Sequence, residues 1–374
     1  MKRYKLMIPG PVDVEDEVLE QMGAPVIAHY GKEWVEVYRE TIGYLKQIFR
    51  TEGDVYILIG SGSAGLDAAI GSMLGGGESV LVIVNGFFGE RLLEIARSYH
   101  LSAYALESEW GKPASPKAIE DVIKDKEGFQ AVAVVHHETS TGVMNPVEKI
   151  GEICKRYDIP LIVDAVSSLG GSNLAVDEWG IDVCVSSSQK CLEAPPGLSP
   201  VAITSHAWQV MEEKGDLGHG WYLNLLNWRN YVTKWADWHP HPVTMATNTI
   251  LALRASLKRI LDEGLEERGR RFKRIAERLR DGLRELDFEL LIDGEYSSSV
   301  VTSVISPPGI SPDEIRNFLK NEYDLLIAGG IGSLKDKIFR IGHIGKSASP
   351  EYIDYLLSAL KDFRQRRGGR YEAS

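Results

Sequence analysis

The chain has 374 residues, of which 44% are hydrophobic and 25% are charged, as is typical of a globular protein with two or three domains. Its formal net charge of -11 disfavours nucleic acid and anionic membranes as main partners, since both are negatively charged. No apolar run approaches the roughly 20 residues that a membrane span needs, and the run before Pro9 is too short for a signal peptide.

The cysteines and the basic C-terminal run carry little functional signal. Cys154, Cys184 and Cys191 form neither a CxxC pair nor a metal-binding spacing, which predicts free thiols in the reducing cytoplasm. The basic run at 364–367 is short, and a helix end or solvated tail explains it better than a binding site.

Apolar runs alternate with helical patterns over the first two hundred residues. We expect strands at 55–59, 79–84, 131–135, 160–163 and 182–186. We expect helices among them at 64–73, 88–100 and 147–157. Runs without polar alternation are typical of strands that are buried on both faces. Strands that alternate with helices indicate an α/β domain with a mostly parallel sheet.

The pattern changes after about residue 245. Residues 251–286 predict long helices with a leucine stripe on one face and a solvated, charged opposite face. Beyond them we expect strands at 298–305 and 338–342 and helices at 312–323 and 350–363. We therefore predict an N-terminal segment over 1–15, a large domain over 16–263 and a smaller α+β domain over 264–374.

Polar loops follow several of the predicted strands, at the edge where α/β proteins bind their ligands. The loop 60–63 (GSGS) precedes a helix, so its N–H groups favour a phosphate, although a plain turn explains it equally well. The loop 85–91 places Phe87 and Phe88 between glycines, where they either stack on a flat ring or pack in the core.

A third loop, 136–142, contains two histidines and a glutamate. A metal site is disfavoured there because no second ligand follows at i+4. A hydroxyl group of Thr139 that forms a hydrogen bond with a cofactor is favoured instead.

Asp164 and Lys190 form the most specific pair in the sequence. Asp164 ends an apolar strand, where a carboxylate needs a cationic partner. Lys190 lies among small hydroxyl residues, and partial desolvation lowers the pKa of a lysine and makes its amine nucleophilic. An acid for a pyridinium nitrogen and a Schiff-base lysine are what a pyridoxal phosphate site requires.

These segments resemble the class V aminotransferases, above all the alanine–glyoxylate and serine–pyruvate aminotransferases. The resemblance rests on 164–171 (DAVSSLGG), 188–190 (SQK) and 194–197 (APPG), and extends from 9–11 (PGP) to 340–342 (RIG). It implies a fold type I architecture, with a mostly parallel seven-stranded sheet between helices in the large domain. It also implies a homodimer whose active sites lie at the subunit boundary.

The resemblance further implies roles for individual residues. Lys190 would carry pyridoxal 5′-phosphate as a Schiff base, Asp164 would pair with the pyridinium nitrogen, and Thr139 would bond the 3-oxygen side of the ring. Phe88 takes the ring-stacking position, where relatives often have tryptophan. The residues that would serve the phosphate are Ser61, Gly62, Ser63 and Gln189.

Four more positions are implied in the same way. His241 and Thr244 match a segment that reaches the phosphate of the partner subunit in relatives. Arg340 matches the arginine that pairs with the substrate carboxylate, a task that suits a planar guanidinium. Gly10 lies where the N-terminal segment approaches the substrate in relatives.

The resemblance implies ping-pong transamination from alanine or serine to glyoxylate or pyruvate. Pyridoxamine–pyruvate, aminoethylphosphonate and ureidoglycine aminotransferases stay open as alternatives. A non-catalytic regulatory homologue is disfavoured because Lys190 and Asp164 are both present, and a desulfurase because Cys191 is the last cysteine. Residues Tyr30, Trp34 and His343 either shape the pocket or pack in the core.

Overall fold

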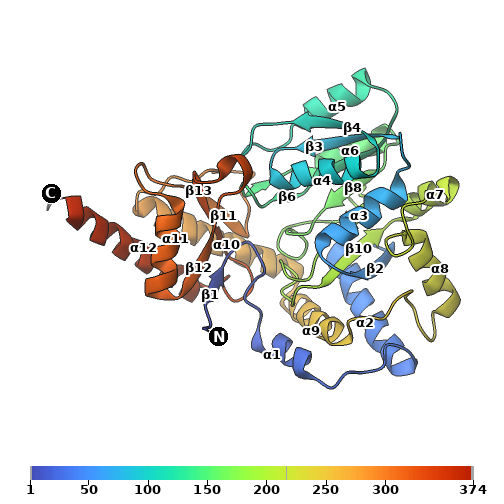
Figure 1. The fold of residues 1–374 in the computed structure, drawn as a ribbon, viewed down its shortest axis with the longest axis horizontal. Coiled ribbons are helices and arrows are strands. Elements are labelled where there is room, and N and C mark those ends of the chain that lie inside the picture. Colours follow the sequence, from blue (N-terminus) through green and yellow to red (C-terminus); the bar gives the residue numbers. More distant parts are fainter. Residues whose placement is uncertain (1, 216, 372–374) are drawn as a thin grey trace.

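The computed structural model describes residues 2–215 and 217–371. Residues 1 and 372–374, the outer ends of the first and last predicted domains, lie outside the described residues. The described chain folds around two main sheets, a larger one on the right of Figure 1 and a smaller one on the left.

The larger sheet has seven strands in the order β2-β10-β9-β8-β5-β3-β4. Strand β10 runs antiparallel to β2 and β9, whereas the other neighbouring pairs are parallel. The predicted fold class and sheet are therefore confirmed. The seven strands are β2 (Asp54–Ile59), β3 (Ser79–Val84), β4 (Ser102–Glu107), β5 (Phe129–Val135), β8 (Leu161–Asp164), β9 (Val183–Val185) and β10 (Leu198–Ile203).

Both faces of this sheet are buried, as the unbroken apolar runs predict. Leu81 and Ile83 of β3 pack in one hydrophobic cluster, and Val80 and Val82 pack in the other. The first cluster contains residues of α2 (Lys32–Phe49), α5 (Pro116–Asp125), α6 (Val147–Arg156) and α9 (Thr247–Glu263). The second contains residues of α3 (Gly62–Met73), α4 (Phe87–Ser98), α7 (Ser205–Lys214) and α8 (Leu225–Trp235).

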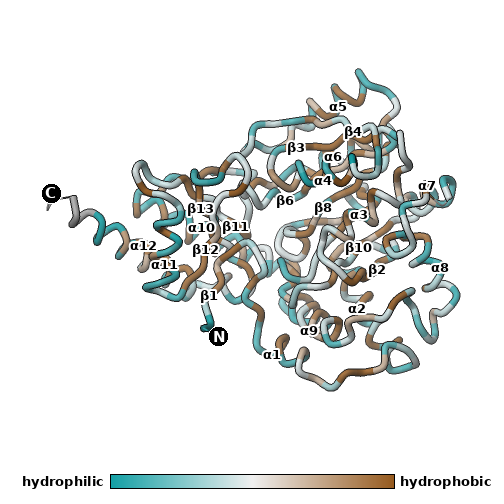
Figure 2. Tube along the Cα trace, in the orientation of Figure 1, coloured by the Kyte–Doolittle hydropathy of each residue, from teal (hydrophilic) through white to brown (hydrophobic). Residues whose placement is uncertain are grey.

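The smaller sheet has four strands in the order β1-β12-β13-β11. They are β1 (Lys5–Met7), β11 (Val301–Ile305), β12 (Leu325–Gly329) and β13 (Ile338–Gly342). Its apolar core contains residues of three helices, α10 (Leu265–Glu285), α11 (Pro312–Tyr323) and α12 (Pro350–Tyr371). Figure 2 shows hydrophobic residues along the strands and hydrophilic residues along much of α11 and α12.

The N-terminal segment packs against the C-terminal part of the chain. Strand β1 pairs in parallel with β12, so that Met7 lies opposite Ile327. The sequence pattern did not predict this strand, because three residues carry no periodicity. The boundary that we propose between 263 and 264 lies at the break between α9 and α10, where Gly264 has a φ of 82°.

The remaining short elements connect these layers. They are α1 (Asp16–Glu20), η1 (Gln21–Gly23), β6 (His137–Glu138), β7 (Val143–Met144) and η2 (Gly332–Leu334). The basic run at 364–367 belongs to α12, where Arg366 and Arg367 form ion pairs with Glu322 and Glu314 of α11. Among the described residues, no helix has the length and apolar character to cross a membrane.

Candidate active site

A cavity of about 500 Å³ lies between residues of the four-stranded sheet, the start of α4, loops of the larger domain and the N-terminal segment. It brings together five of the predicted site residues, which are far apart in the sequence. They are Gly10, Phe88, Thr139, Lys190 and Arg340. The cavity is therefore the centre of the candidate active site.

Lys190 lies largely buried in the segment between β9 and β10. Its Nζ donates a hydrogen bond to the carbonyl oxygen of Pro9, at 2.8 Å. Burial, with a smaller contribution from the charge of Arg340, lowers the pKa of Lys190 to about 8. The amine is therefore a better nucleophile and base near neutral pH than an exposed lysine.

Gly10 permits the close approach of the N-terminal segment to this lysine. Its φ is 133°, and a Cβ atom there would lie 2.5 Å from Cδ and 2.7 Å from Nζ of Lys190. The next contact of the segment is a hydrogen bond from the amide of Val12 to the carbonyl of Gln189. A residue with a side chain at position 10 would displace the reactive amine.

Asp164 lies buried at the carboxyl end of β8. Its Oδ1 accepts a hydrogen bond from the amide of Val166 at 2.8 Å. Burial raises the pKa of Asp164 to about 7. No other hydrogen-bond donor of the described chain reaches this carboxyl group. A protonated ring nitrogen would supply the missing donor and favour the ionised carboxylate.

The loop 60–63 has the features of a phosphate site. Helix α3 begins at Gly62, two residues earlier than predicted, and Ser61 is its N-cap without a side-chain capping bond. The first N–H groups of a helix have no partner within it, and the helix dipole favours an anion. A Cβ atom on Gly62 would lie 2.5 Å from Val166, so this turn packs closely beside the Asp164 segment.

Gln189 adds a second feature that fits a bound group. Its Oε1 is buried without a hydrogen-bond partner among the described residues. A phosphate oxygen accepts hydrogen bonds, so it would pair with the Nε2 donors of this side chain, which occupy the position of Oε1 when the amide group is rotated by 180°. The donors present therefore fit pyridoxal phosphate, although the loop 60–63 and Gln189 do not line the cavity.

Arg340 on β13 is held by two backbone carbonyls. Its Nε donates to Gly329 and its Nη1 donates to Thr139, both at 2.9 Å. Burial lowers the pKa of Arg340 to about 10, so the guanidinium stays charged at neutral pH. Its Nη2 remains for a ligand, because it donates no hydrogen bond to any of the described residues.

Glu138 is a positioning residue that sequence reasoning missed. Its Oε2 accepts hydrogen bonds from the amides of Phe88 and Gly89, both at 3.0 Å. Its Oε1 accepts from the amide of Ser140 at 3.1 Å. The carboxylate thus caps α4 and orients Phe88 toward the cavity that it lines. A glutamate that follows an apolar strand, with a serine two residues later, was the available signal.

The two histidines beside Glu138 are held by hydrogen bonds at Nδ1, and Nε2 of His137 is buried without a partner among the described residues. Nδ1 of His136 lies 3.0 Å from Oγ of Ser168, and Nδ1 of His137 lies 3.1 Å from the carbonyl of Ser167. The carboxylate of Glu138 is already committed to amide donors. The loop therefore serves to hold α4 and the Asp164 segment together.

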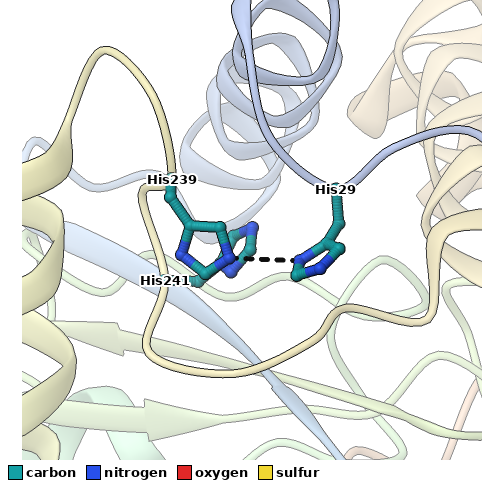
Figure 3. A group of neighbouring side chains, drawn as sticks. All are labelled: His29, His239 and His241. Carbon is teal, nitrogen blue, oxygen red and sulfur yellow. Dashed lines mark hydrogen bonds between the residues drawn. The ribbon is translucent and has the colours of Figure 1, made fainter.

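His241 lies outside the cavity, in a cluster with His29 and His239 (Figure 3). Its Nε2 accepts a hydrogen bond from Nε1 of Trp34 at 2.7 Å, and its Nδ1 lies 2.8 Å from the carbonyl of Val243. Both nitrogens are therefore engaged, which disfavours a metal ligand at this position. Thr244, three residues further on, is exposed.

The three residues whose roles stayed open do not line the cavity either. Trp34 is fully buried in the core beside His241, and His343 is fully buried with its Nε2 at 3.0 Å from Oγ1 of Thr302. Tyr30 is half exposed. Packing accounts for Trp34 and His343.

A second arginine lines the cavity, whereas the sequence identified only Arg340 for a carboxylate. Arg316 lies on α11, at the edge of the cavity formed by β12. The sequence gave no signal of this role, because α11 has the pattern of an ordinary amphipathic surface helix. Only the packing of α11 against β12 brings it to the site.

A buried lysine and a buried carboxyl group at the same edge of such a sheet are what a fold type I pyridoxal-phosphate enzyme requires. The chain belongs to the aminotransferase class-V family, whose family model matches residues 12–336. It is a transaminase, and its cofactor is pyridoxal 5′-phosphate.

Three proteins to which this chain is similar agree with this family. An uncharacterized aminotransferase of Methanocaldococcus jannaschii is 42% identical, over 94% of this chain and 90% of its own. The crystal structure of a ureidoglycine–glyoxylate aminotransferase from Bacillus subtilis is 33% identical, with a TM-score of 0.93 over 98% of this chain and 94% of that chain. An alanine–glyoxylate aminotransferase from Nostoc sp. is 30% identical, with a TM-score of 0.92 over 97% and 95%.

Proposed function

We propose that this aminotransferase moves an amino group from a small amino acid, alanine or serine, to glyoxylate or pyruvate by a ping-pong mechanism. The observation that carries the proposal is the fixed guanidinium of Arg340 in the same cavity as the amine of Lys190. Arg340 would hold the α-carboxylate through Nη2 and so place the α-carbon near Lys190.

Lys190 would anchor the cofactor and then act on the substrate. When bound, pyridoxal phosphate supplies an electron sink for the bonds of the α-carbon. Lys190, with a pKa of about 8, would remove the α-proton as a general base and return it as a general acid. The carbonyl of Pro9 would orient the amine between these two steps.

The other residues would bind and orient. Asp164 would keep the ring nitrogen protonated, and Phe88 would pack against the ring. Ser61, Gly62, Ser63 and Gln189 would bind the phosphate, and Thr139 would bond the 3-oxygen side. Gly10 would close the substrate side, because its missing side chain lets the N-terminal segment contact Lys190.

We also propose a homodimer in which the exposed Thr244 serves the site of the partner subunit, while the buried His241, engaged by Trp34 and Val243, supports this segment from within. Support comes from an exposed aromatic patch beside this segment, made of Tyr30, Trp235 and Trp238, with ring centroids 5.8 and 5.9 Å apart. Exposed apolar patches of this kind mark protein interfaces. The three buried free cysteines support the reducing cytoplasm as its compartment.

The relatives named for ureidoglycine and alanine both use glyoxylate, and ureidoglycine is the second candidate donor. A pyridoxamine–pyruvate activity would use the cofactor's unphosphorylated form as substrate. The helix start at Gly62 favours a tightly held phosphate instead.

The test is a panel of half-reactions followed by absorbance with the pyridoxal-phosphate-loaded enzyme. Alanine and serine are expected to bleach the cofactor band, and glyoxylate and pyruvate to restore it. Turnover with pyridoxamine and not with amino acids would contradict the proposal. Borohydride reduction followed by peptide mass analysis is expected to find the cofactor on Lys190. The purified chain is expected to sediment as a dimer.

The matched variants are Lys190→Ala and Lys346→Ala. Lys346 forms surface ion pairs with Asp16 and Glu15, outside the cavity. Lys190→Ala is expected to lose the reduced adduct and at least about a thousandfold in half-reaction rate, since nucleophile and base are lost together. Lys346→Ala is expected to keep both. A normal half-reaction rate in the Lys190→Ala variant would contradict the mechanism.

A further inference from the structure

A second pocket lies between α2, β2 and α8, separate from the active-site cavity. Its volume is about 190 Å³, and no described residue lines both this pocket and the active-site cavity. It adjoins β2, the edge strand of the seven-stranded sheet, on the right of Figure 1. The proposed transamination makes no use of this pocket, so its lining has to be explained by another ligand.

The size and the apolar lining of the pocket suit one small hydrophobic group. The apolar side chains that line it are Ile42, Val55, Val232, Ala236 and Pro240. For comparison, an apolar cavity of about 150 Å³ in another protein holds one benzene ring. A single aromatic ring or a short branched chain would therefore fill the pocket.

Tyr38 of α2 lines the pocket and has a hydroxyl group without a partner. The side chain is 4% exposed, and its Oη forms no hydrogen bond with the described residues. Burial raises the pKa of Tyr38, and the nearby backbone amide of Ile57 opposes this rise only in part, so the hydroxyl stays protonated. A buried donor without an acceptor is costly, and an oxygen atom of a ligand would supply the acceptor.

The charged side chains of the lining favour an anion. Two of them are cations, Arg39 and Lys46, and one is an acid, Asp54. Arg39 pairs with Asp237, but these two side chains are 60% and 91% exposed, so water screens the pair. The carboxylate of Asp54 is already engaged, since its Oδ2 accepts a hydrogen bond from Nε1 of Trp208 at 2.9 Å. A ligand carboxylate would therefore meet an excess of positive charge.

We propose that this pocket is a second ligand site, which binds a small aromatic or branched monocarboxylic acid. The apolar part of the acid would fill the pocket, and its carboxylate would face Arg39 and Lys46. The hydroxyl of Tyr38 would donate a hydrogen bond to one oxygen of the ligand. Binding involves no covalent step and is independent of transamination.

The first test uses benzoate as the probe and follows its binding to the pyridoxal-phosphate-loaded enzyme by calorimetry. Acetate lacks the apolar body and is expected to bind on the order of tenfold more weakly, because little apolar surface is buried. Benzamide lacks the charge and is expected to bind several-fold more weakly. Equal binding of acetate and benzoate would overturn the proposal, since the pocket would then contribute nothing.

The active-site arginine is the other group that can attract a carboxylate. Each titration is therefore repeated with an Arg340→Gln enzyme, in which the active-site cavity has lost this cation. Benzoate is expected to bind to this variant as it does to the wild type. Loss of binding in Arg340→Gln would place benzoate in the active-site cavity and would contradict a second site.

The next variant tests the hydroxyl of Tyr38. Tyr38→Phe is expected to weaken benzoate binding on the order of tenfold, because a hydrogen bond to a charged acceptor is lost. Without benzoate its melting temperature is expected not to fall, because no hydrogen bond within the protein is removed. The matched control is Tyr44→Phe, since Tyr44 lies on the same helix and its hydroxyl donates to Glu40 outside the pocket. Equal losses of benzoate binding in the two variants would overturn the assignment.

The remaining variants test the charge and the space. Arg39→Gln and Lys46→Gln are each expected to weaken benzoate binding on the order of threefold, whereas Lys32→Gln, an exposed control on the same helix, is expected to have no effect. Ala236→Leu is expected to abolish binding, because its larger side chain occupies the pocket. Thermal unfolding checks that each variant remains folded. Full binding in Ala236→Leu, or in both charge variants, would show that benzoate binds elsewhere.

Discussion

At the scale of single residues, burial decides what Lys190 and Asp164 can do. It lowers the pKa of Lys190 to about 8 and raises that of Asp164 to about 7. The amine of Lys190 is thus brought close to the pH at which it exchanges protons, as general acid–base chemistry requires, whereas Asp164 needs a protonated partner such as the ring nitrogen to stay ionised. The sequence predicted that the pKa of Lys190 is lowered, because small neighbours at a strand end cannot solvate an amine fully.

The lowered pKa of Lys190 predicts how the empty enzyme captures its cofactor. The neutral amine attacks the aldehyde, so the capture rate is expected to rise about tenfold per pH unit below pH 8 and to level off above it. Stopped-flow absorbance between pH 6 and pH 10 measures this rate. An increase that continues to pH 10, as for an exposed lysine, would contradict the shift.

At the scale of elements, the start of α4 shows how one carboxylate positions a helix. Glu138 accepts the amides of Phe88 and Gly89. This contact requires glycine at position 86, because a Cβ atom on Gly86 would clash with the side chain of Glu138. The helix itself was predictable from its apolar stripe, but its cap was not. The residue that caps the helix lies at a strand end fifty residues away. The local periodicity of a sequence cannot predict a contact between such distant residues.

Replacement of Glu138 by glutamine tests this cap. The amide group keeps one acceptor and turns the other into a donor that faces N–H groups. We expect a loss of about 1–3 kcal/mol in the free energy of unfolding and weaker cofactor retention, because Phe88 is no longer held. Urea denaturation and dialysis of the loaded enzyme measure the two effects.

The control for this variant is Glu90→Gln on the same helix. Glu90 is exposed, and it lies in the first turn of α4. Surface substitutions of this kind change stability by about 0.5 kcal/mol or less. Equal effects in the two variants would show that charge near the helix start matters and the cap does not.

At the scale of the whole molecule, one buried ion pair ties the two parts together beside the active site. Arg268 of α10 is 3% exposed and donates to Glu193, three residues after Lys190, and to the carbonyls of Gly170 and Cys191. Glu193 also accepts from the amide of Gly345, beyond β13. The pair thereby links the lysine segment to the part of the chain that carries Arg340.

Removal of one partner from this pair is expected to destabilise the fold strongly. Arg268→Met leaves Glu193 buried without its cation, at a cost of about 3–5 kcal/mol. Arg270→Met, on the same helix, removes an exposed arginine that pairs with Glu267 and is expected to cost less than 1 kcal/mol. Urea denaturation of both variants measures the difference, and equal costs would show that the buried pair is not a structural link.

The sequence alone determined the fold class, the cofactor and the reaction type. Those properties depend on short segments, such as 164–171 and 188–190, whose residue types and order are sufficient to indicate the chemistry. Strand β4, at the sheet edge, and strand β10, which contains Pro200, escaped prediction because edge exposure and proline both weaken the strand pattern.

Only the tertiary structure decided which charges meet in the cavity. Arg316 lies on a surface helix, and the helix becomes part of the site because it packs on β12. Likewise, β1 pairs with a strand more than three hundred residues away, and this pairing brings Gly10 to Lys190. Contacts between distant segments leave no local periodicity in the sequence, so the lining of the cavity depends on the fold, whereas the cofactor chemistry can be predicted from the sequence.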